Sequence, residues 1–564
     1  MRLKKIVFFF PVALFFFQCS LVGIQFHPKT PEKPGKYPTF TAAQKLLAQQ
    51  TKKRTCFDVK YYKLDLKIDA DKKTIGGNVT MTSVLLKKQD TIQIDLYKNL
   101  KVDSIVYNTK KINFSRVEGA IFIALPNSIR AGNLFTLTIS YNGKPNPAKK
   151  APWDGGLVWK KDKQGNPWAG VACESEGASL WWPNKDDVSD EADSTDIYLN
   201  VPEILSVVSN GSYKCTKLKE QNTKTVHWHV SYPINNYNVT FYLGNYTLIA
   251  DTFVSRQSRD TIKFSYYILP EHSAVAKSHF QQVKQQIDFY ERAFGNYPWP
   301  KDGYKLIESP YEGMEHQSAI AYGNKFKNDG NGFDYILLHE TAHEWWGNSV
   351  TSADLSDVWL QEGFATYAEA LYVEDTKGQA AYLNYLYWYR ITIMNKLPVV
   401  KQTGLRYFPA KDGDVYTKGA WILHSLRNTI KNDSVFFDIL KTFRTENNCK
   451  QIFTNAFVDI VNKKTQSDYN WFFQQYLYRR DVPLLEFYKD ANYFYYRWKD
   501  VNDDFNKLPV EVNFGSKKEI IYPNQSIQKI KVDASYGTDI SFSDHYVYFG
   551  TKKNKQLVAL KNLK

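Results

Sequence analysis

Residues 335–347 read YILLHETAHEWWG and carry the pattern H-E-x-x-H at 339–343. The segment is rich in apolar residues and lacks proline, which predicts a buried helix. Because residues four apart lie on one face of a helix, His339 and His343 can bind the same metal ion. Glu362, separated from the second histidine by a gap of eighteen residues, is the candidate third ligand. Three protein ligands leave a fourth position open for water, which is typical of catalytic zinc rather than structural zinc.

Glu340 is adjacent to His339 in sequence but points about 100° away around a helix. This direction is unsuited to a metal ligand and brings the carboxylate beside water at the metal. We therefore predict that Glu340 is a catalytic general base. The alternative is a pair of core histidines satisfied by hydrogen bonds. It is disfavoured because the pattern rarely arises by chance in a chain with 10 His.

The chain on both sides of this motif changes its hydrophobic period twice. Apolar and polar residues alternate over 62–69, 92–96 and 135–139, which predicts antiparallel strands up to about residue 255. The period then becomes helical, with one apolar stripe over 280–294 and mostly helical segments over 334–475. Alternation returns near the C-terminus. The order predicts an α+β multidomain protein with its chemistry in a mostly helical middle domain.

The pattern divides the chain into five predicted segments. These are a signal segment (1–23), a linker containing a short helix near 42–50 (24–55), an N-terminal β domain (56–255), a catalytic domain (256–482) and a C-terminal β-sandwich (483–564).

Composition limits the classes of protein that the chain can be. Hydrophobic residues make up 43% and aromatic residues 16% of the 564 residues, which excludes wholesale disorder. The formal net charge is +15, but the lysines are dispersed, so we expect a solvated basic surface and no nucleic-acid partner. The cysteines form no C-x-x-C pair, which excludes a zinc finger, and their pairing cannot be deduced.

The first residues have the pattern of an export signal. Arg2, Lys4 and Lys5 precede an apolar run over 6–17 that is short for a membrane span. Cys19 follows and is a candidate lipid acceptor, although Gln18 departs from the small residue usual before such a cysteine. We expect an exported protein of the periplasm or cell envelope, and membrane attachment through Cys19 stays open.

Several motifs together resemble one known family. His339–His343 with Glu362 in the stretch WLQEGFA is similar to the M1 zinc aminopeptidases, gluzincins that include aminopeptidase N and leukotriene A4 hydrolase. Three further segments resemble family motifs: EGMEH at 312–316 (G-x-M-E-N), YTKG at 416–419 (Y-x-K-G) and CESEG at 173–177 (Q-x-E). These motifs span residues 173–420.

The resemblance implies a thermolysin-like catalytic domain that binds one zinc ion and cleaves peptides with a free N-terminus. Glu315 and Glu174 would then bind the substrate's α-ammonium group, and Tyr416 would donate a hydrogen bond to the oxyanion. The backbone of Gly313 and Met314 would bind the substrate backbone.

Two residues depart from the family pattern. His316 stands where the family usually has Asn, and Glu312 where it usually has Gly, which affects the details of substrate binding. After the β-sandwich pattern the chain shows no large helical domain of the kind many members carry, so we expect a more open cleft.

Two alternatives stay open. The first is an endopeptidase or another hydrolase built on the same zinc site. The second is a non-catalytic envelope binding protein with the same fold. Loss of Glu340 or of a metal ligand would mark such a binding protein, and the chain has lost none of them.

Overall fold

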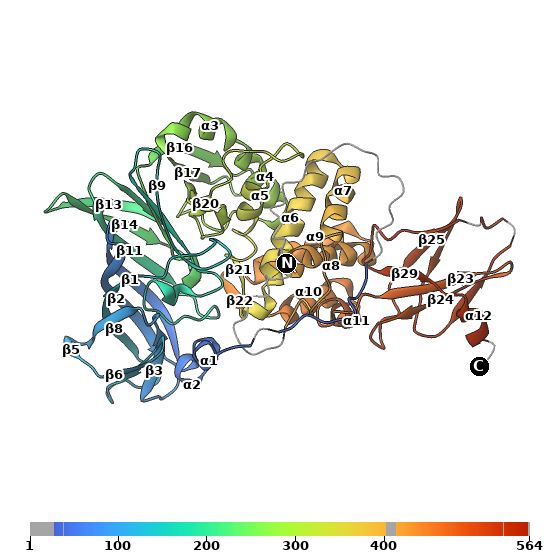
Figure 1. Ribbon diagram of the computed structural model, residues 1–564, viewed down its shortest axis with the longest axis horizontal. Coiled ribbons are helices and arrows are strands. Elements are labelled where there is room, and N and C mark those ends of the chain that lie inside the picture. Colours follow the sequence, from blue (N-terminus) through green and yellow to red (C-terminus); the bar gives the residue numbers. More distant parts are fainter. Residues whose placement is uncertain (1–27, 38, 402–412, 534, 538, 562–564) are drawn as a thin grey trace, which may run out of the picture.

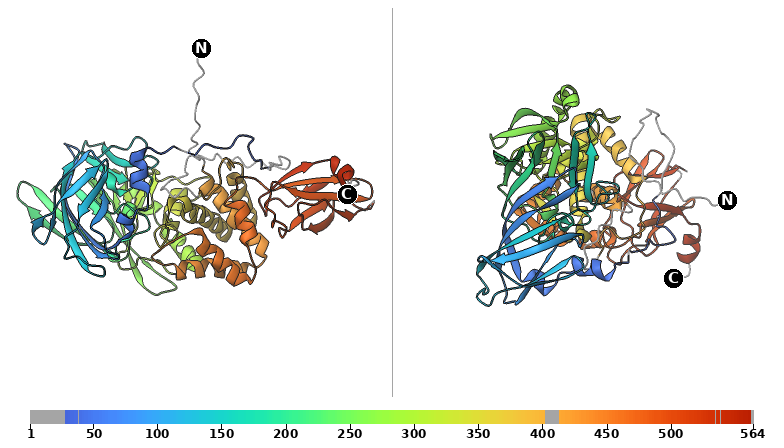
Figure 2. Two further views of the ribbon diagram at one scale, coloured as in Figure 1. Left: turned by 90° about the horizontal axis from the view of Figure 1, so that it is seen from below. Right: turned by 60° about the vertical axis from the view of Figure 1, so that its left-hand side comes forward.

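The computed structural model describes residues 28–561 except 38, 402–412, 534 and 538. Three parts follow one another along the long axis of the molecule, as Figure 1 shows: a β-rich part, a helical part and a small β part. Figure 2 shows the first and last at opposite ends, with the helices between them. The predicted α+β order is therefore confirmed. The predicted signal segment lies outside the described residues.

The N-terminal part is built on an eight-stranded sheet with the order β13-β14-β11-β1-β2-β8-β4-β5. In β1 the residues alternate between buried and more exposed, as the sequence predicts for a half-buried strand. The strands of this sheet are β1 (Phe57–Asp69), β2 (Thr74–Leu85), β4 (Leu100–Tyr107), β5 (Lys110–Lys111), β8 (Leu134–Gly143), β11 (Ser194–Pro202), β13 (Ser212–Lys219) and β14 (Thr223–Val230).

Two smaller sheets and two short helices complete this part. One sheet contains β3 (Thr91–Asp95), β7 (Ala120–Ala124) and β6 (Phe114–Val117). The other contains β12 (Ser206–Ser209), β15 (Phe241–Gly244), β10 (Pro167–Ala172) and β9 (Gly156–Lys161). The helices are α1 (Ala42–Ala48), where a short helix was predicted, and α2 (Lys52–Thr55).

A five-stranded sheet continues beyond the point where the alternating pattern ends. Its order is β16 (Thr247–Val254), β17 (Thr261–Ile268), β18 (Tyr304–Glu308), β20 (Ile320–Tyr322) and β19 (Gly313–Met314). The expectation that strands end near residue 255 is thus wrong. Strands β18 and β20 are buried on both faces and show no alternation that the sequence could reveal.

The helical part confirms the predicted mostly helical middle region. The apolar stripe over 280–294 belongs largely to α4, which ends at Gly295 with φ +98°. The helices are α3 (Ser273–His279), α4 (Gln282–Phe294), α5 (Tyr335–Ala342), α6 (Trp359–Lys377), α7 (Gln379–Arg390), α8 (Asp414–Ile430), α9 (Asp433–Glu446), α10 (Thr454–Thr465) and α11 (Asn470–Tyr476). Two short strands, β21 (Val350–Ser352) and β22 (Lys450–Ile452), pair beside them.

Helix α5 is shorter than predicted. It begins after Asp334, whose carboxylate accepts hydrogen bonds from the first-turn amides, and it ends at Ala342. His343 is its C-terminal cap and keeps right-handed helical dihedral angles. The backbone then turns through Gly347, whose φ is +122°. The helical geometry lasts just long enough to keep both histidines on one face.

The C-terminal part is the predicted β-sandwich. One sheet contains β27 (Gln528–Lys531), β24 (Tyr493–Lys499), β23 (Leu484–Lys489) and β29 (Gly550–Lys553). The other contains β26 (Lys517–Ile521), β25 (Val510–Phe514) and β28 (Ile540–Phe542), and α12 (Gln556–Lys561) follows. The rings of Phe494 and Phe514 pack against each other between the two sheets, with their centroids 5.0 Å apart. The sandwich contacts the helical part through an ion pair between Arg390 and Asp544 at 2.9 Å.

Over the described residues, no helix combines the length and the apolar character needed to cross a membrane.

Candidate metal centre

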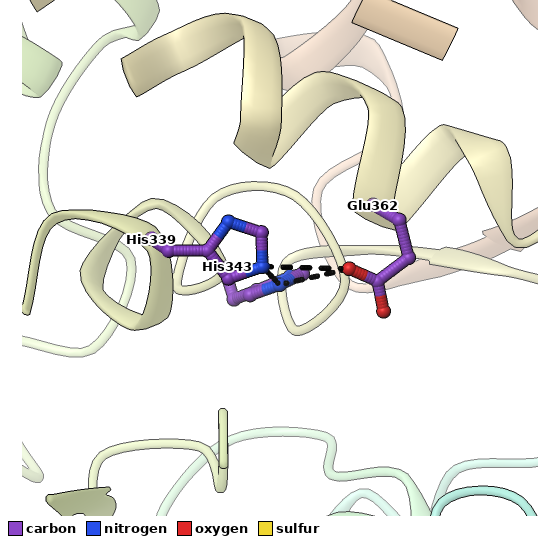
Figure 3. A group of neighbouring side chains, drawn as sticks. All are labelled: His339, His343 and Glu362. Carbon is purple, nitrogen blue, oxygen red and sulfur yellow. Dashed lines mark hydrogen bonds and ion pairs between the residues drawn. The ribbon is translucent and has the colours of Figure 1, made fainter. Parts of the chain in front are cut away.

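The two histidines and Glu362 meet between the end of α5 and the first turn of α6 (Figure 3). The Nε2 atoms of His339 and His343 are 3.1 Å apart. Glu362 Oε2 lies 3.5 Å from the first and 3.4 Å from the second. A tetrahedral zinc ion 2.0–2.1 Å from each donor would hold the donors about 3.3–3.4 Å apart. The three side chains therefore fit a zinc ion.

The outer nitrogen of each imidazole has its own acceptor. His339 Nδ1 lies 2.6 Å from Glu369 Oε1, and His343 Nδ1 lies 2.7 Å from the Trp346 carbonyl oxygen. When each Nδ1–H donates to its acceptor, each Nε2 keeps a free lone pair that points at the metal position. The hydrogen bonds thus select the tautomer that a metal needs.

Glu369 is a site residue that the sequence analysis missed. Its other oxygen accepts hydrogen bonds of 2.6 Å from the hydroxyls of both Tyr385 and Tyr389. A signal was present, because Glu369 follows Glu362 by two turns of α6 and so shares its helical face. The tyrosine partners lie on α7 and carry no sequence pattern that identifies them.

Glu340 is 7% exposed, and one of its carboxylate oxygens lies within 4.8 Å of ligand atoms of Glu315 and His343. A Cβ atom at Gly313 would lie 2.5 Å from Glu340 Oε1, so β19 passes directly against this carboxylate. Burial raises the pKa of Glu340 to about 8, an effect opposed by His339 and His343 and strengthened by neighbouring glutamates. A bound dication would favour the ionised form that a general base requires.

Glu315 and Glu174 come together with the metal ligand Glu362. One carboxylate oxygen from each lies within 4.8 Å of the other two. Burial raises the pKa of Glu174, and the charge of Glu315 raises it further. The Oε1 atom of Glu174 is buried and has no hydrogen-bond partner among the described residues. Carboxylates held this close are stabilised by a cation between them.

Tyr237 is a second residue that the sequence analysis missed. Its hydroxyl donates to Glu315 Oε1 at 3.2 Å and accepts from Gln361 Nε2 at 3.1 Å. The amide oxygen of Gln361 accepts from the Ser352 hydroxyl at 2.5 Å, which fixes the orientation of the amide. The Tyr237 proton therefore points at Glu315. Tyr237 and Glu174 belong to the N-terminal part, whereas Glu315 and Gln361 lie in the middle part.

Tyr416 lies in the first turn of α8, with its ring centre 6.2 Å from that of His339. Burial, followed by the charges of Glu362 and Glu174, raises its pKa well above 10, so the phenol keeps its proton and can donate. Helix α8 reaches this position because it crosses α6 at two glycines. A Cβ atom at Gly419 would lie 2.8 Å from the Gly363 Cα.

The two departures from the family pattern have different environments. The imidazole of His316 is fully buried, with Nδ1 2.6 Å from the Tyr242 hydroxyl, and burial lowers its pKa to about 3. Among the described residues, some His and Glu side chains lie close enough together to bind one metal ion. His316 belongs to none of these clusters. Glu312 is half-buried and accepts a hydrogen bond of 3.1 Å from the Tyr335 hydroxyl.

A β-rich part, a helical part and a His-His-Glu metal centre beside paired carboxylates define the class of zinc-dependent metallopeptidases. Comparison with protein families agrees with this class. Residues 278–476 match the peptidase family M1 domain, and residues 59–237 match the peptidase M1 N-terminal domain. The two matches together cover more than half of the chain, which belongs to peptidase family M1.

Relatives of known activity are similar over parts of their length. The chain is 27% identical to endoplasmic reticulum aminopeptidase 1 of Mus musculus over 229 residues, which are 37% of this chain and 24% of that protein. It is 24% identical to leucine aminopeptidase 2 of Kluyveromyces lactis over 433 residues, 72% of this chain and 61% of that protein. The chain thus spans less than two thirds of the length of these relatives.

Solved structures show the same fold. The M1 zinc metallopeptidase from Deinococcus radiodurans superposes with a TM-score of 0.65 at 22% identity, covering 77% of this chain and 96% of that chain. A variant of that protein was crystallised with a Tyr-Ser-Ala substrate, at a TM-score of 0.65, 21% identity and the same coverage.

Proposed function

We propose that the protein is a zinc aminopeptidase that removes single residues from the free N-terminus of peptides. The observation that carries the proposal is the placement of Glu315 and Glu174 within 4.8 Å of the metal ligand Glu362. An α-ammonium group held between the two carboxylates lies a fixed, short distance from the metal. Only the first peptide bond then reaches the metal, which limits cleavage to one residue.

The proposed cofactor is one zinc ion per chain, held by His339, His343 and Glu362. When bound there, zinc polarises the carbonyl of the scissile bond and lowers the pKa of water. The other groups that the reaction needs belong to the chain itself.

Glu340 takes a proton from the attacking water and passes it to the nitrogen of the leaving peptide. Its position against Gly313 supports this role, because a substrate paired with β19 would present its scissile bond to that carboxylate. Tyr416 donates a hydrogen bond to the oxyanion that forms when water adds to the carbonyl. The backbone of Gly313 and Met314 offers the substrate an edge strand to pair with.

One assay distinguishes this function from its alternatives. Aminoacyl chromogenic amides and their N-acetylated counterparts are compared with and without a chelator. We expect cleavage of the free amines alone, and its loss when zinc is removed. Equal cleavage of the blocked compounds would favour an endopeptidase or another hydrolase. Inactivity of zinc-loaded protein on every peptide would favour a binding protein.

We also propose that the protein is exported to the periplasm or cell envelope, with Cys19 as the candidate lipid acceptor. The basic residues and apolar run before Cys19 support this proposal. Mass spectrometry of the mature N-terminus tests it. A diacylglyceryl-modified Cys19 and loss of membrane association in Cys19→Ser would support the anchor, and an unprocessed Met1 in a soluble fraction would refute export.

A further inference from the structure

Glu312 is an acidic residue at the site whose role the hydrolytic chemistry leaves unexplained. It replaces the glycine usual in the family motif and is half-buried. The side-chain partner that the described residues offer it is the neutral hydroxyl of Tyr335, at 3.1 Å. Within the described chain no lysine, arginine or histidine lies within ion-pair distance of it. A half-buried carboxylate without a cation is an attractive position for a cationic ligand.

Tyr335 places this carboxylate relative to the metal centre. It is the first residue of α5 and precedes His339 by four positions, so the two side chains share one face of the helix. Slightly more than one helical turn, about 6 Å along the axis, separates them. Glu312 therefore lies on the metal-facing side of α5 and displaced from the metal toward the N-terminal end of that helix.

Strand β19 gives the direction in which a substrate would pass. Glu315, the proposed amine ligand, follows the strand, Gly313 lies against Glu340, and Glu312 precedes it. A peptide with its amine at Glu315 and its scissile bond at Glu340 must continue toward Glu312. Glu312 and Glu315 are three positions apart in the sequence, which is about 10 Å in an extended chain.

The leaving peptide reaches that far with its first residues. The second Cα beyond the amine-bearing residue lies at most about 7–8 Å from the Cα of that residue, since neighbouring Cα atoms are 3.8 Å apart. A lysine or arginine side chain covers the remaining distance. A cationic side chain on either of the first two leaving residues can thus meet Glu312.

We propose that Glu312 forms a subsite for a lysine or arginine side chain within the first two residues of the leaving peptide. The inference deepens the proposed aminopeptidase function and rests on it. The preference is for peptides with a basic residue directly after the cleaved bond or one position later. A partly exposed ion pair contributes about 1 kcal/mol, which corresponds to about fivefold in kcat/KM.

The test compares peptides that differ in one charge. Ala-Lys-Ala-Ala and Ala-Ala-Lys-Ala are each paired with a version in which norleucine, a neutral analogue of similar length, replaces lysine. We expect zinc-loaded wild-type protein to favour at least one lysine peptide about fivefold, and this ratio to shrink as salt rises. In Glu312→Gln the ratio should fall to within twofold of one, while cleavage of alanine p-nitroanilide is retained.

Two control variants separate charge from structure. Tyr335→Phe removes the hydrogen bond and keeps the carboxylate, so the lysine preference should persist. Glu203→Gln removes an exposed charge from the N-terminal part and should change neither ratio. An equal loss on lysine and norleucine peptides in Glu312→Gln would mean a structural role for Glu312 and would overturn the subsite.

Failure of the proposed aminopeptidase function gives a different result from failure of the Glu312 subsite. If wild-type protein cleaves none of the aminoacyl chromogenic amides, the aminopeptidase proposal fails. The subsite is then tested by calorimetric binding of the same peptides to zinc-loaded Glu340→Gln protein. Equal dissociation constants for the lysine and norleucine peptides would overturn it there as well.

Discussion

Glutamate side chains perform several distinct tasks within a few ångströms of one another. Glu362 faces the two Nε2 atoms, and Glu369 binds the outer nitrogen of His339. Glu340 lies against β19, while Glu315 is held by Tyr237. All of these residues are glutamates, and they differ in the groups that their carboxylates contact. This concentration of negative charge lies in a chain of formal net charge +15 and requires cations to stabilise it.

The first prediction concerns the general base. Glu340→Gln keeps the shape of the side chain but cannot accept the proton from water. We expect kcat to fall at least a hundredfold. Zinc content, measured by elemental analysis, should stay at the wild-type level because Glu340 is not a ligand. Wild-type turnover in this variant would refute the assignment.

The second prediction concerns Tyr237. Phenylalanine at this position removes the hydroxyl that orients Glu315, and loss of one hydrogen bond of about 1 kcal/mol should raise KM for free-amine substrates about fivefold. We expect kcat to change less than twofold, because the metal and the base are untouched. Tyr246→Phe, which removes another buried hydroxyl of the N-terminal part, is the matched control. A fall in kcat with unchanged KM would contradict this role.

At the scale of elements, the crossing of α6 and α8 sets the geometry of the site. Gly363 directly follows the ligand Glu362, and Gly419 lies three residues after Tyr416. The close approach of the two backbones therefore brings a metal ligand and a hydroxyl donor to the same place. Both glycines belong to stretches quoted in the sequence analysis, yet their contact joins segments more than fifty residues apart.

The third prediction tests this crossing. Gly419→Ala places a methyl group where only 2.8 Å is available, and such overpacking costs about 1–3 kcal/mol. The helices must separate, which displaces Tyr416, so kcat should fall tenfold to a hundredfold. Thr429→Ala, near the C-terminal end of α8, is the control and should retain activity. Wild-type kcat in Gly419→Ala would show that the crossing does not position Tyr416.

Sequence patterns predicted the local part of the site, and the family resemblance implied Glu174, Glu315 and Tyr416. Neither revealed Glu369 or Tyr237. His339 and His343 were identifiable because a single helix turn sets their spacing. Tyr237 was not, since its role depends on a short 3-10 helix (Asn236–Asn238) that contacts Gln361 of α6, 124 residues away in the sequence. The β-sandwich was visible as alternation, whereas β18 was hidden because both of its faces are buried. Alternation of apolar and polar residues appears only where one face of a strand is exposed to solvent. A strand that is buried on both faces shows no such alternation.

At the scale of the whole molecule, Glu191 lies at the junction of the N-terminal and helical parts. It is buried, and the side chains facing it include Asn235 on one side and Thr351 and Gln451 on the other. Burial raises its pKa to about 7, and nearby Asp190 adds to this effect. The junction therefore contains a carboxyl group that resists ionisation.

The fourth prediction follows from this group. Because the folded pKa is raised, folding favours the protonated form, so the free energy of unfolding falls as pH rises from about 4.5 through 7. The full shift corresponds to at most about 3 kcal/mol. Glu191→Gln should remove this loss and be more stable than wild type at pH 8, with little difference at pH 5. Denaturant unfolding at pH 5 and pH 8 measures the free energy of unfolding of both proteins. An equal pH dependence in the two proteins would contradict the prediction.

The amine-binding residues come from two parts of the chain, which has a consequence for how the protein can be altered. The ligands and the base lie between residues 339 and 362, whereas Glu174 and Tyr237 belong to the N-terminal part. The proposed amine site therefore combines Glu315 from the middle part, which also holds the metal ligands, with Glu174 and Tyr237 from the N-terminal part. Substitutions at Glu174 or Tyr237 would therefore alter the proposed amine site from the N-terminal part, without replacing a metal ligand or Glu340.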